Sequence, residues 1–587
     1  MKASDYIIKF LGAAGVTHVF GYIGGAVTHL IDSLYKNETI SFVQFGHEQA
    51  AAFAASAYAK YTGKVGVAVA TSGPGATNLI TGIADAYFDS APTVFITGQV
   101  NTHDFKYTSN VRQKGFQETD IVSIVKPITK YCTLVDDINN LEKELVKSFS
   151  IALDGRKGPV LIDLPMDIQR QDIKTGKDSF AASIKKKSAE MDEGLLNSVL
   201  ELIKTSSFPL VLSGGGVRSA CAEQNLIRFC ELLGIPVAVT LMGKDSFPND
   251  HEYFAGFIGA YGNRFGNLAL SKSDCLLVLG SRLDSRQTGN VLKSFANKKI
   301  IWVDIDRNEI ESAKITPDIS IIADADCFLK EMLEYCRIRN SSYRASPNIR
   351  DGITVLKRLF NPLSELERAH KNNWQYKVMR CISDFLEDRD VVCADVGQIQ
   401  MIAAQVLMIR KSQRFINSGG MAPMGYALPS AAAISMACGS RCVVIAGDGG
   451  LQMNIQELKM VSEHALPVII IVFNNKSLGM IKQFQELYFE KRYSATDEEH
   501  GYKSCDFTRI ARAYGINSIT INEKSDLSQE FDHVFNKSEL PVLVEVVMDY
   551  QTFTYPKLEF NKPIEEIDPE VTPEEANIIH HCLNDIP

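Results

Sequence analysis

Short apolar runs alternate with longer stretches of helical period along most of the chain. The runs are rich in Val, Ile and Leu and are bounded by Gly, Pro or polar residues. This alternation is typical of parallel β-sheets that helices cover on both faces. The clearest predicted strands are 65–70, 159–163, 209–212, 275–279, 443–446 and 467–473. The pattern therefore predicts an α/β protein built from doubly wound parallel sheets.

Two polar stretches, 169–188 and 340–373, interrupt this alternation and are interpreted as linkers. The first includes three consecutive lysines at 185–187, which would add little to a hydrophobic core. The tail at 551–587 is acidic and rich in proline, so we expect it to lie across the surface with little regular structure. Three domains are then predicted, at 1–170, 190–335 and 370–550.

Composition narrows the class of protein. The chain has 587 residues and a net charge of −9 that is spread along its length, which excludes a disulfide-stapled peptide and offers no basic surface for nucleic acid. Its 12 cysteines form no C-x-x-C pair, which is typical of thiols in a reducing compartment. Asp5 interrupts any signal peptide, and no apolar run reaches the roughly 18 residues of a membrane span. We expect a cytoplasmic protein without a membrane partner.

The most informative segment is a complete βαβ unit in the predicted third domain. Asp448 lies within a glycine-rich turn after one strand, and Asn475 follows the next strand. A crossover of this length usually returns the second strand parallel and close to the first, so both side chains are expected at neighbouring carboxyl ends. A carboxylate and an amide oxygen at such an edge suit Mg²⁺, which shares a phosphate ligand, and the glycines let the backbone approach that phosphate.

Each motif alone is more often an ordinary turn or strand end. Together, 27 residues apart and bracketing one helix, they match the thiamine-diphosphate signature, which begins Gly-Asp-Gly and ends Asn-Asn. Further matching blocks follow in order at 21–26, 47–50, 71–78, 115–118, 418–420 and 424–425. With these blocks the chain up to about residue 551 resembles the large catalytic subunit of the acetolactate synthases, within the thiamine-diphosphate decarboxylases and carboligases. The tail resembles them least.

The resemblance implies thiamine diphosphate and Mg²⁺ as cofactors. Glu48 matches the residue that hydrogen-bonds the cofactor's pyrimidine N1′ and promotes the tautomer that removes the thiazolium C2 proton. From the residues alone, a first-turn carboxylate favoured by the helix dipole is the alternative. Phe116 and Gln117 would face the substrate, and Lys130 would help to position it. The family's site lies between two chains, which implies a homodimer or a dimer of dimers.

The remaining cofactor contacts are also implied by the resemblance. Met424 would force the folded shape of the cofactor, although a lone Met is usually core filler. The 71–78 loop would border the pyrimidine, although it could equally be a structural turn. The residues that would contact the cofactor or metal are Gly25, Thr71, Pro74 and Asn78 for the pyrimidine end, Gly397, Gln398, Gly449 and Gly450 for the diphosphate, and Asp448, Asn475 and the Ser477 carbonyl for the metal.

A second cofactor is implied for the middle domain. The glycine-rich turn at 213–216 follows a predicted strand but lacks the G-x-G-x-x-G spacing, so a tight turn is the alternative. The segments 241–243, 280–289 and 303–306 resemble those that cradle FAD in acetolactate synthases, where the flavin is largely structural. The matching residues are Gly215, Gly216, Arg282, Arg286, Asp304 and Asp306.

Four departures from the family leave the identity of the acceptor substrate open. A diphosphate-holding His is replaced by Ile399, a Pro by Ile23, and the Trp that shapes the acceptor pocket by Phe484, while the segment 554–560 lacks the family's Pro-rich ending. The expected activity is transfer of a two-carbon unit from pyruvate to a carbonyl acceptor. The alternatives are transfer to a keto-sugar nucleotide in surface polysaccharide synthesis, a flavin-dependent pyruvate oxidase, and a non-catalytic homologue. The sequence does not decide whether a regulatory subunit binds.

Overall fold

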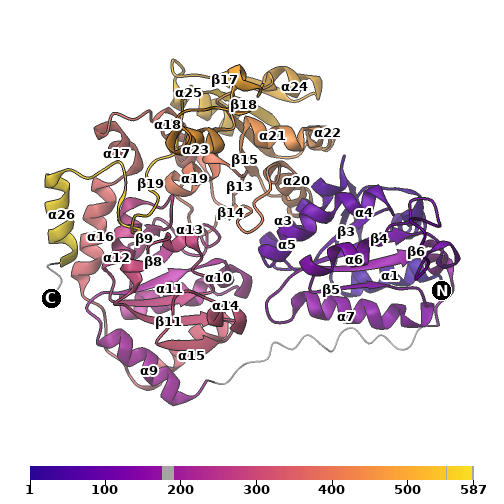
Figure 1. The fold of residues 1–587 in the computed structure, drawn as a ribbon, viewed down its shortest axis with the longest axis horizontal. Coiled ribbons are helices and arrows are strands. Elements are labelled where there is room, and N and C mark those ends of the chain that lie inside the picture. Colours follow the sequence, from indigo (N-terminus) through magenta and orange to yellow (C-terminus); the bar gives the residue numbers. More distant parts are fainter. Residues whose placement is uncertain (175–190, 550, 585–587) are drawn as a thin grey trace.

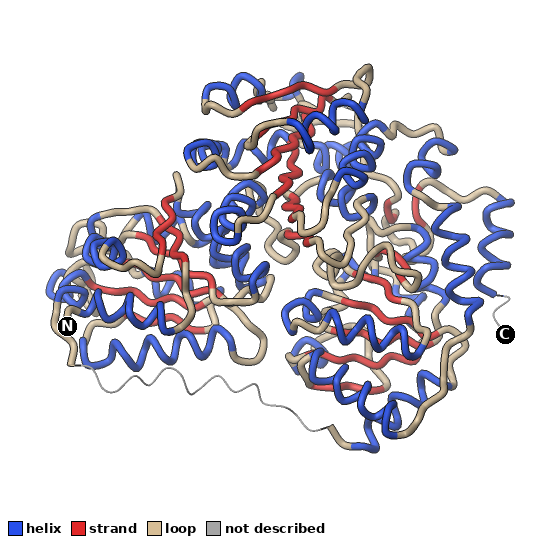
Figure 2. Tube along the Cα trace, turned by 180° about the vertical axis from the view of Figure 1, so that it is seen from behind, coloured by secondary structure: helices blue, strands red, loops and turns tan. Residues whose placement is uncertain are grey.

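The computed structural model describes residues 1–174, 191–549 and 551–584, which form three domains around three six-stranded parallel sheets (Figure 1). Helices lie on both faces of each sheet (Figure 2). The predicted α/β class with parallel sheets is therefore confirmed. Most of the predicted linker at 169–188, including the lysines at 185–187, falls outside the described residues. No helix in the described parts of the chain combines the length and the apolar character that crossing a bilayer requires.

The first domain has the strand order β2-β1-β3-β4-β6-β5. Its strands are β1 (His18–Gly21), β2 (Ser41–Gln44), β3 (Gly66–Ala70), β4 (Thr93–Gln99), β5 (Tyr131–Leu134) and β6 (Val160–Pro165). Its helices are α1 (Ala3–Ala13), α2 (Thr28–Tyr35), α3 (Glu48–Thr62), α4 (Pro74–Asn78), α5 (Ile80–Phe88), α6 (Ile121–Val125), α7 (Leu141–Leu153) and α8 (Met166–Arg170).

The middle domain has the order β12-β11-β10-β7-β8-β9. Its strands are β7 (Pro209–Ser213), β8 (Val237–Val239), β9 (Phe254–Phe257), β10 (Cys275–Leu279), β11 (Lys299–Asp304) and β12 (Ile319–Ile322). Its helices are α9 (Glu193–Lys204), α10 (Gly215–Ala220), α11 (Glu223–Leu233), α12 (Arg264–Lys272), α13 (Ser285–Thr288), α14 (Arg307–Glu311) and α15 (Ala325–Ile338).

The third domain has the order β14-β13-β15-β16-β18-β17, which repeats the topology of the first domain strand for strand. Its strands are β13 (Val391–Ala394), β14 (Arg414–Ile416), β15 (Cys442–Gly447), β16 (Val468–Asn474), β17 (Asn517–Ile521) and β18 (Val542–Val547). Its helices are α18 (Trp374–Phe385), α19 (Gln398–Val406), α20 (Ala427–Cys438), α21 (Asp448–Met453), α22 (Leu458–Glu463), α23 (Gly479–Tyr488), α24 (Phe507–Ala513) and α25 (Leu527–Asp532).

Two alanine-rich helices, α3 and α20, join the first and third domains. Their small side chains are almost all buried in one shared core, where the rings of Phe53 and Tyr426 meet edge to face at 5.5 Å. Alanine allows two helix backbones to approach closely, so a sequence that is poor in large apolar residues can still be fully buried here. Helix α3 ends at Gly63, whose φ of 72° forms a left-handed cap. The carboxyl edges of the two sheets are held relative to each other by this helix pair.

The prediction that 340–373 is a polar linker is wrong. The segment folds into α16 (Pro347–Leu359) and α17 (Pro362–Arg368). On α16, Ile349, Ile353 and Leu356 recur at helical spacing and are buried in the core of the middle domain. The charged residues between them made an amphipathic helix look like a linker.

The tail is more regular than its prolines indicated. It contains a two-stranded antiparallel pair, β19 (Lys557–Leu558) and β20 (Ile567–Asp568), and the helix α26 (Pro573–Asn584). Helix α26 lies beside α16 at the edge of the molecule (Figure 1), and the backbone carbonyl of Cys582 approaches Gly352 so closely that a Cβ there would stand 2.2 Å away. The proline at 573 starts the helix rather than preventing it, because the first turn needs no proline N–H.

Candidate functional site

The carboxyl edge of the third sheet brings Asp448 and Asn475 together in the fold. Strands β15 and β16 are parallel neighbours in register from Cys442–Val468 to Gly447–Phe473. Asp448 directly follows β15, and Asn475 directly follows β16. The predicted adjacency of the two strands is confirmed, and it places a carboxylate and a carboxamide at the end of adjoining strands, the usual position of ligand sites in open α/β sheets.

Asp448 is buried at the start of α21. The Tyr502 hydroxyl donates to its Oδ2 at 3.0 Å. Burial raises the pKa of Asp448 to about 6, while hydrogen bonds from Tyr502 and Ser504 act in the opposite direction. The group is therefore mainly ionised at pH 7, and its negative charge is poorly solvated. A divalent cation would stabilise such a carboxylate.

A tight loop holds Asn475 and Ser477. The Asn475 Oδ1 accepts from the backbone N–H of Ser477 at 3.2 Å. Among the described residues, the buried Ser477 Oγ has no hydrogen-bond partner. The loop is anchored by a bridge between Ser477 and Asp497 and by a buried ion pair between Lys482 and Asp497 at 3.0 Å. A buried ion pair of this kind fixes the loop in one conformation.

Glycines keep the space around Asp448 narrow but free of side chains. A Cβ at Gly449 would lie 3.0 Å from Met424 Cε and 2.8 Å from Leu478 Cδ2. A Cβ at Gly450 would lie 2.7 Å from Asp395 Oδ1. Gly397, at a φ of 140°, faces open space. These positions form a cradle that side chains would fill.

Gln398 completes the cradle. A Cβ at Gly479 would overlap the Gln398 Oε1 at 2.0 Å and the Asn475 Nδ2 at 2.7 Å, which places Gln398 and Asn475 against the same turn. The Gln398 Nε2 donates to Gln483 Oε1 at 3.1 Å. The donor set is therefore one carboxylate, amide oxygens and backbone groups, and this chemistry fits Mg²⁺ with a diphosphate. No group of three or more His, Cys, Asp or Glu side chains that could hold a metal occurs in the described residues, so the fit depends on this mixed set.

Asp395 positions Met424. It directly follows β13, is buried, and accepts hydrogen bonds from the backbone N–H groups of Gly425 at 2.9 Å and Ala427 at 3.0 Å. Burial raises its pKa to about 6. The loop that carries Met424 is thus tied to the same sheet edge as the Gly-Asp-Gly turn.

The carboxyl edge of the first sheet gathers the predicted pyrimidine-end residues. Glu48 is the first residue of α3, is largely buried, and accepts from Asn78 Nδ2 at 2.9 Å. A Cβ at Gly75 would lie 2.8 Å from Thr71 Cγ2 and 3.1 Å from Glu48 Oε1. The Thr71 Oγ1 accepts from the Ala26 N–H at 3.1 Å, which brings in the turn after Gly25. Pro74 starts the short helix α4 between these residues.

Gln117 reaches the same edge in a strained conformation. Its φ is 62°, and a Cβ at Gly73 would lie 3.0 Å from its Cβ. Non-glycine residues in this region of φ are uncommon and cluster at functional sites. Its neighbour Phe116 is 86% exposed. The structure thus places Gln117 beside the 71–78 loop and leaves the Phe116 ring uncovered by the single chain.

Lys130 is not part of this group. It precedes β5, so it lies at the amino edge of a fully parallel sheet, opposite the carboxyl edge. Its ammonium donates to the backbone carbonyls of Ile151 at 2.5 Å and Asp154 at 2.6 Å, at the carboxyl end of α7. This placement does not fit the substrate-positioning role predicted for Lys130.

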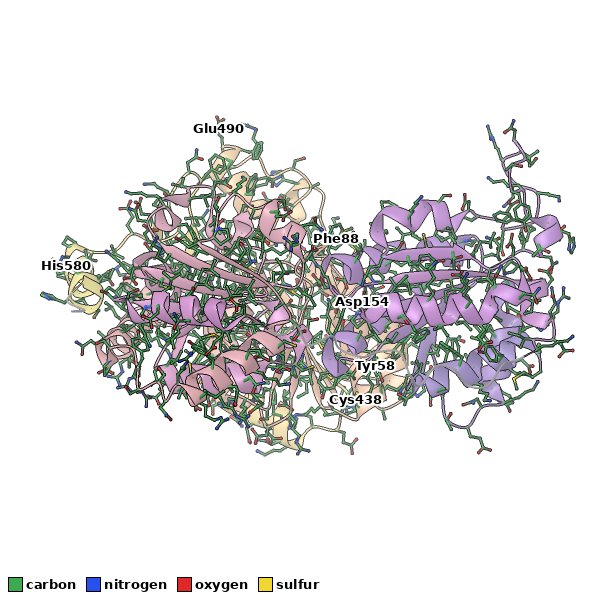
Figure 3. All side chains as sticks on the ribbon, turned by 90° about the horizontal axis from the view of Figure 1, so that it is seen from below. Tyr58, Phe88, Asp154, Cys438, Glu490 and His580 are labelled. Atoms are coloured by element: carbon green, nitrogen blue, oxygen red, sulfur yellow. The ribbon has the colours of Figure 1, made fainter. Side chains whose placement is uncertain are left out.

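A large cavity lies between the middle domain and the other two domains. It has a volume of about 330 Å³ and is lined by Gly215, Gly216, Arg282, Arg286 and Asp304, all predicted to contact FAD. Residues of the first domain, including Phe88, and of the third domain complete its wall. Figure 3 labels Phe88 where the first domain faces the rest of the molecule.

Asp306, also predicted to contact FAD, does not line the cavity. It caps α14 and pairs with Arg156 at 3.5 Å. Arg282 lines the cavity but is paired with Asp284 at 3.1 Å. Burial raises the pKa of Asp304 to about 6. Arg156 and Arg282, which both line the cavity, are therefore each paired with a carboxylate.

Two of the departures from the family have different surroundings. Ile399 is buried in the core of the third domain, on α19. Phe484, on α23, is 54% exposed and its ring lies 4.6 Å from that of Tyr488. The replacement at 399 is therefore absorbed by the core, whereas Phe484 belongs to an open aromatic surface beside the loop that carries Ser477.

Three residues of the site were missed by the sequence analysis. Asp395 had a signal, because an Asp and a Gly close the strand β13 in the same way as in the Gly-Asp-Gly turn. Tyr502 has no signal in the sequence, because it reaches Asp448 from a loop 54 residues away. Glu457 had none either. Its carboxylate accepts from the Gly46 N–H at 2.9 Å and so links the third domain to the turn before Glu48.

Comparison with known proteins finds similarity over the whole length of the three domains. Residues 1–124 match the family described as thiamine pyrophosphate enzyme, N-terminal TPP binding domain, residues 196–332 its central domain, and residues 395–546 its C-terminal TPP binding domain. The chain is 36% identical over 563 residues to the probable acetolactate synthase large subunit of Methanocaldococcus jannaschii, covering 94% of this chain and 92% of that protein.

Two further relatives come from a bacterium and a plant. Identity is 36% over 566 residues to the acetolactate synthase isozyme 3 large subunit of Escherichia coli, with 95% of this chain and 96% of the relative covered. Identity is 36% over 571 residues to the chloroplastic acetolactate synthase 1 of Zea mays, with 95% and 87% covered. The similarity therefore extends across archaea, bacteria and plants.

Proposed function

Because the chain belongs to the thiamine pyrophosphate enzymes, we propose that it forms acetolactate from pyruvate, with thiamine diphosphate and Mg²⁺ as cofactors. It is an enzyme that transfers two-carbon units, similar to acetolactate synthases over 94% of its length. The observation that carries the proposal is the meeting of Asp448 and Asn475 at adjoining strand ends beside a glycine cradle. The relatives give no support to a pyruvate oxidase or to a keto-sugar nucleotide acceptor.

The residues of the third domain would hold the cofactor by its charged end. Asp448, Asn475 and the Ser477 carbonyl would bind Mg²⁺, and Gly397, Gln398, Gly449 and Gly450 would border the diphosphate. Met424, which approaches Gly449 and whose loop is tied to Asp395, would set the shape of the cofactor. When bound, thiamine diphosphate supplies a carbon centre that adds to the keto group of pyruvate and accepts the electrons left by CO₂.

Glu48 would act at the other end of the site. Its carboxylate would hold a proton at the pyrimidine N1′, and its near-complete burial removes water that would compete for that hydrogen bond. Asn78 donates to one carboxylate oxygen and so keeps the side chain in place. Thr71, Pro74 and Gln117 would shape the surrounding pocket, from which water is excluded while pyruvate is positioned.

We infer that two copies of the chain form the complete site. Several large apolar side chains are exposed near the carboxyl edges of the first and third sheets, where a monomer would leave them in water. They are Tyr22, Ile23, Phe116, Met421 and Met453. A second chain that covers them would bring the Glu48 of one copy to the Asp448 of the other. Sedimentation of an active monomer would contradict this inference. Because relatives are named large subunits, the same experiment also looks for a smaller companion chain.

FAD is our proposal for the large cavity of the middle domain. Gly216 and Gly280 support it, since both line the cavity and their backbones pack so closely that a Cβ at Gly216 would lie 2.6 Å from Gly280 Cα. Arg282 and Arg286 line the same wall and suit a pyrophosphate. Asp306 is not among the proposed FAD contacts, because it does not line the cavity. Purified protein that stays colourless after incubation with FAD and gel filtration would contradict this proposal. We also keep the cytoplasm as the proposed location, because all 12 cysteines are free thiols.

One incubation tests the proposed activity. The protein is supplied with thiamine diphosphate, Mg²⁺, FAD and pyruvate, and the products are identified by mass spectrometry. We expect CO₂ and acetolactate from pyruvate alone. Absence of CO₂ release, with thiamine diphosphate shown to be bound, would contradict the proposal.

A further inference from the structure

A second, smaller cavity lies between the middle and third domains. Its volume is about 110 Å³, which suits a small ion or molecule rather than a nucleotide. It is lined by Lys244 from the β8–β9 connection, by Lys357 of α16, by the start of α17, by Arg380 of α18 and by the end of α19. The wrongly predicted linker therefore supplies one of its walls.

The lining of this cavity is basic and amide-rich. None of the described residues that line it is acidic, while four carry a carboxamide: Asn249, Asn263, Asn361 and Gln405. Several of these carboxamides are already engaged. Asn249 Nδ2 donates to the Phe247 carbonyl at 2.9 Å, and Asn263 Nδ2 donates to the Gln405 carbonyl at 3.0 Å. The amides thus form a fixed polar frame, and the positive charges of the lining come from Lys244, Lys357 and Arg380.

Lys244 is the unusual member of this lining. Its side chain is 2% exposed, and within the described chain its ammonium forms no hydrogen bond or ion pair. Its nearest described partner is the Phe254 ring, whose centroid lies 5.6 Å from Nζ. A single contact with a ring at this distance offsets little of the cost of removing an ammonium from water.

Lys357 adds a second positive charge on the same ring. Its Nζ lies 5.2 Å from the Phe254 centroid and donates to the Phe254 carbonyl at 3.2 Å. Asp250 compensates part of its charge. Arg380 is paired with Asp384 at 3.1 Å, so it adds less uncompensated positive charge to the cavity. Burial and the Lys357 charge together lower the pKa of Lys244 to about 7, so the pair is strained without a counterion.

We propose that this cavity binds a small oxyanion, carboxylate or phosphate, between Lys244 and Lys357. A buried polar group without a partner calls for a specific explanation, and a missing ion is one of the standard ones. An anion would neutralise both ammonium groups and accept hydrogen bonds from them. The size of the cavity and the lack of acidic lining residues favour an anion over a cation or an apolar ligand. This proposal does not depend on the activity proposed above.

The site borders the large cavity. Lys244 faces the small cavity, while its neighbour Asp245 lines the large one and pairs with Arg218 at 3.2 Å and Arg414 at 2.7 Å. The 241–245 segment is therefore a wall shared by the two cavities.

Binding is measured by the thermal midpoint and by calorimetry, with inorganic phosphate and acetate as separate probes. Thiamine diphosphate, Mg²⁺ and FAD are present in excess so that other phosphate sites are filled, and sodium chloride at equal ionic strength is the control. We expect one of the two probes to stabilise the protein saturably, and the one that does so identifies the source of the oxyanion. In the Lys244→Met variant we expect the affinity for that probe to fall at least about 10-fold.

Lys330→Met is the matched control, because Lys330 is an exposed lysine of the middle domain paired with Asp326. It should bind the probe like the wild type. If Lys244→Met does not fold, Lys357→Met takes its place, with the same expected loss. The proposal is overturned if neither probe binds saturably, or if the cavity variants bind as tightly as Lys330→Met.

Discussion

The first and third domains have the same strand order and yet carry different chemistry at their carboxyl edges. In the first domain this edge presents one buried carboxylate, Glu48, held by an amide. In the third domain it presents Asp448 and Asn475 beside glycines. The two domains share a frame set by their apolar strands, while a few residues at strand ends decide what each edge can bind. The apolar residues of the strands thus determine the fold, and the polar residues at the strand ends determine the function.

The most direct test of this difference between the two domains is to replace Glu48, the buried carboxylate of the first domain. We expect Glu48→Gln to lower kcat at least about 100-fold, because the proton at the pyrimidine N1′ is no longer controlled. Affinity for thiamine diphosphate should change less than about threefold, since the third domain holds the charged end. Exchange of the thiazolium C2 hydrogen for deuterium, followed by NMR, reports the effect without turnover.

Glu574→Gln is the control, because Glu574 is an exposed acid in the first turn of α26. It makes the same change at a helix start and tests the macrodipole alternative for Glu48. It should leave exchange unchanged. Normal C2 exchange in Glu48→Gln would contradict the role assigned to this residue.

The corresponding change in the third domain should give the opposite signature. We expect Asp448→Asn to raise the Kd for thiamine diphosphate with Mg²⁺ more than about 10-fold, because the metal loses its one carboxylate. High Mg²⁺ and cofactor should restore part of the activity. Asp532→Asn, a change at a partly exposed carboxylate of the same domain that pairs with Lys537, is the control for calorimetric titration. Equal cofactor affinity in Asp448→Asn and the wild type would show that the metal is held elsewhere.

A smaller effect is expected at Phe484, which lies on the third domain and outside the shared frame. Replacement by Trp would narrow the space near the Ser477 loop, so we expect the ratio of products from pyruvate with a second, larger 2-oxo acid to change a few-fold. The Kd of the cofactor should stay constant. Competition experiments with both acceptors measure the ratio, and an unchanged ratio would remove Phe484 from the acceptor pocket.

The last expected effect is on stability rather than on turnover or binding, and it concerns Glu457, which ties the two domains together. Burial raises its pKa from 4.5 to about 7. The folded protein therefore holds this proton more tightly than the unfolded chain, and its stability falls as pH rises from about 4.5 through 7. Glu457→Gln removes this contribution. Relative to the wild type, we expect the variant to gain roughly 2 kcal/mol between pH 5 and pH 8, seen in thermal midpoints at both values. A pH-independent difference would contradict the raised pKa.

The fold was largely predictable because buried parallel strands are visible as apolar runs. The strand at 275–279 is reproduced to the residue by β10, and those at 65–70 and 467–473 within one residue of β3 and β16. Amphipathic helices rich in charge are harder to predict, and the polar residues of 340–373 indicate a linker where α16 forms. The one helix expected between Asp448 and Asn475 is broken at Asn454, where its side chain donates to the Gly425 carbonyl at 2.8 Å, a contact made by tertiary packing.

The site was predictable where residues lie close to a strand end and not where they arrive from elsewhere. Asp448 and Asn475 have a recognisable spacing, whereas Tyr502 and Glu457 depend on contacts 54 and 411 residues apart. Lys130 matched a family position in sequence but lies at the wrong edge of its sheet. Lys244 gave no signal, because a lysine on a surface and a lysine sealed beneath Phe254 look alike in a sequence.

The central claim is that Glu48 of one chain completes the site formed by Asp448 and Asn475 of another. Mixing two impaired variants, Glu48→Gln and Asp448→Asn, after subunit dissociation and reassembly tests it directly, at cofactor and Mg²⁺ concentrations too low to rescue Asp448→Asn alone. Each mixed dimer would contain one site with both native residues, so about a quarter of the wild-type activity should return from random pairing. Activity that stays at the level of the separate variants, with mixed dimers shown to form, would contradict a site shared between chains.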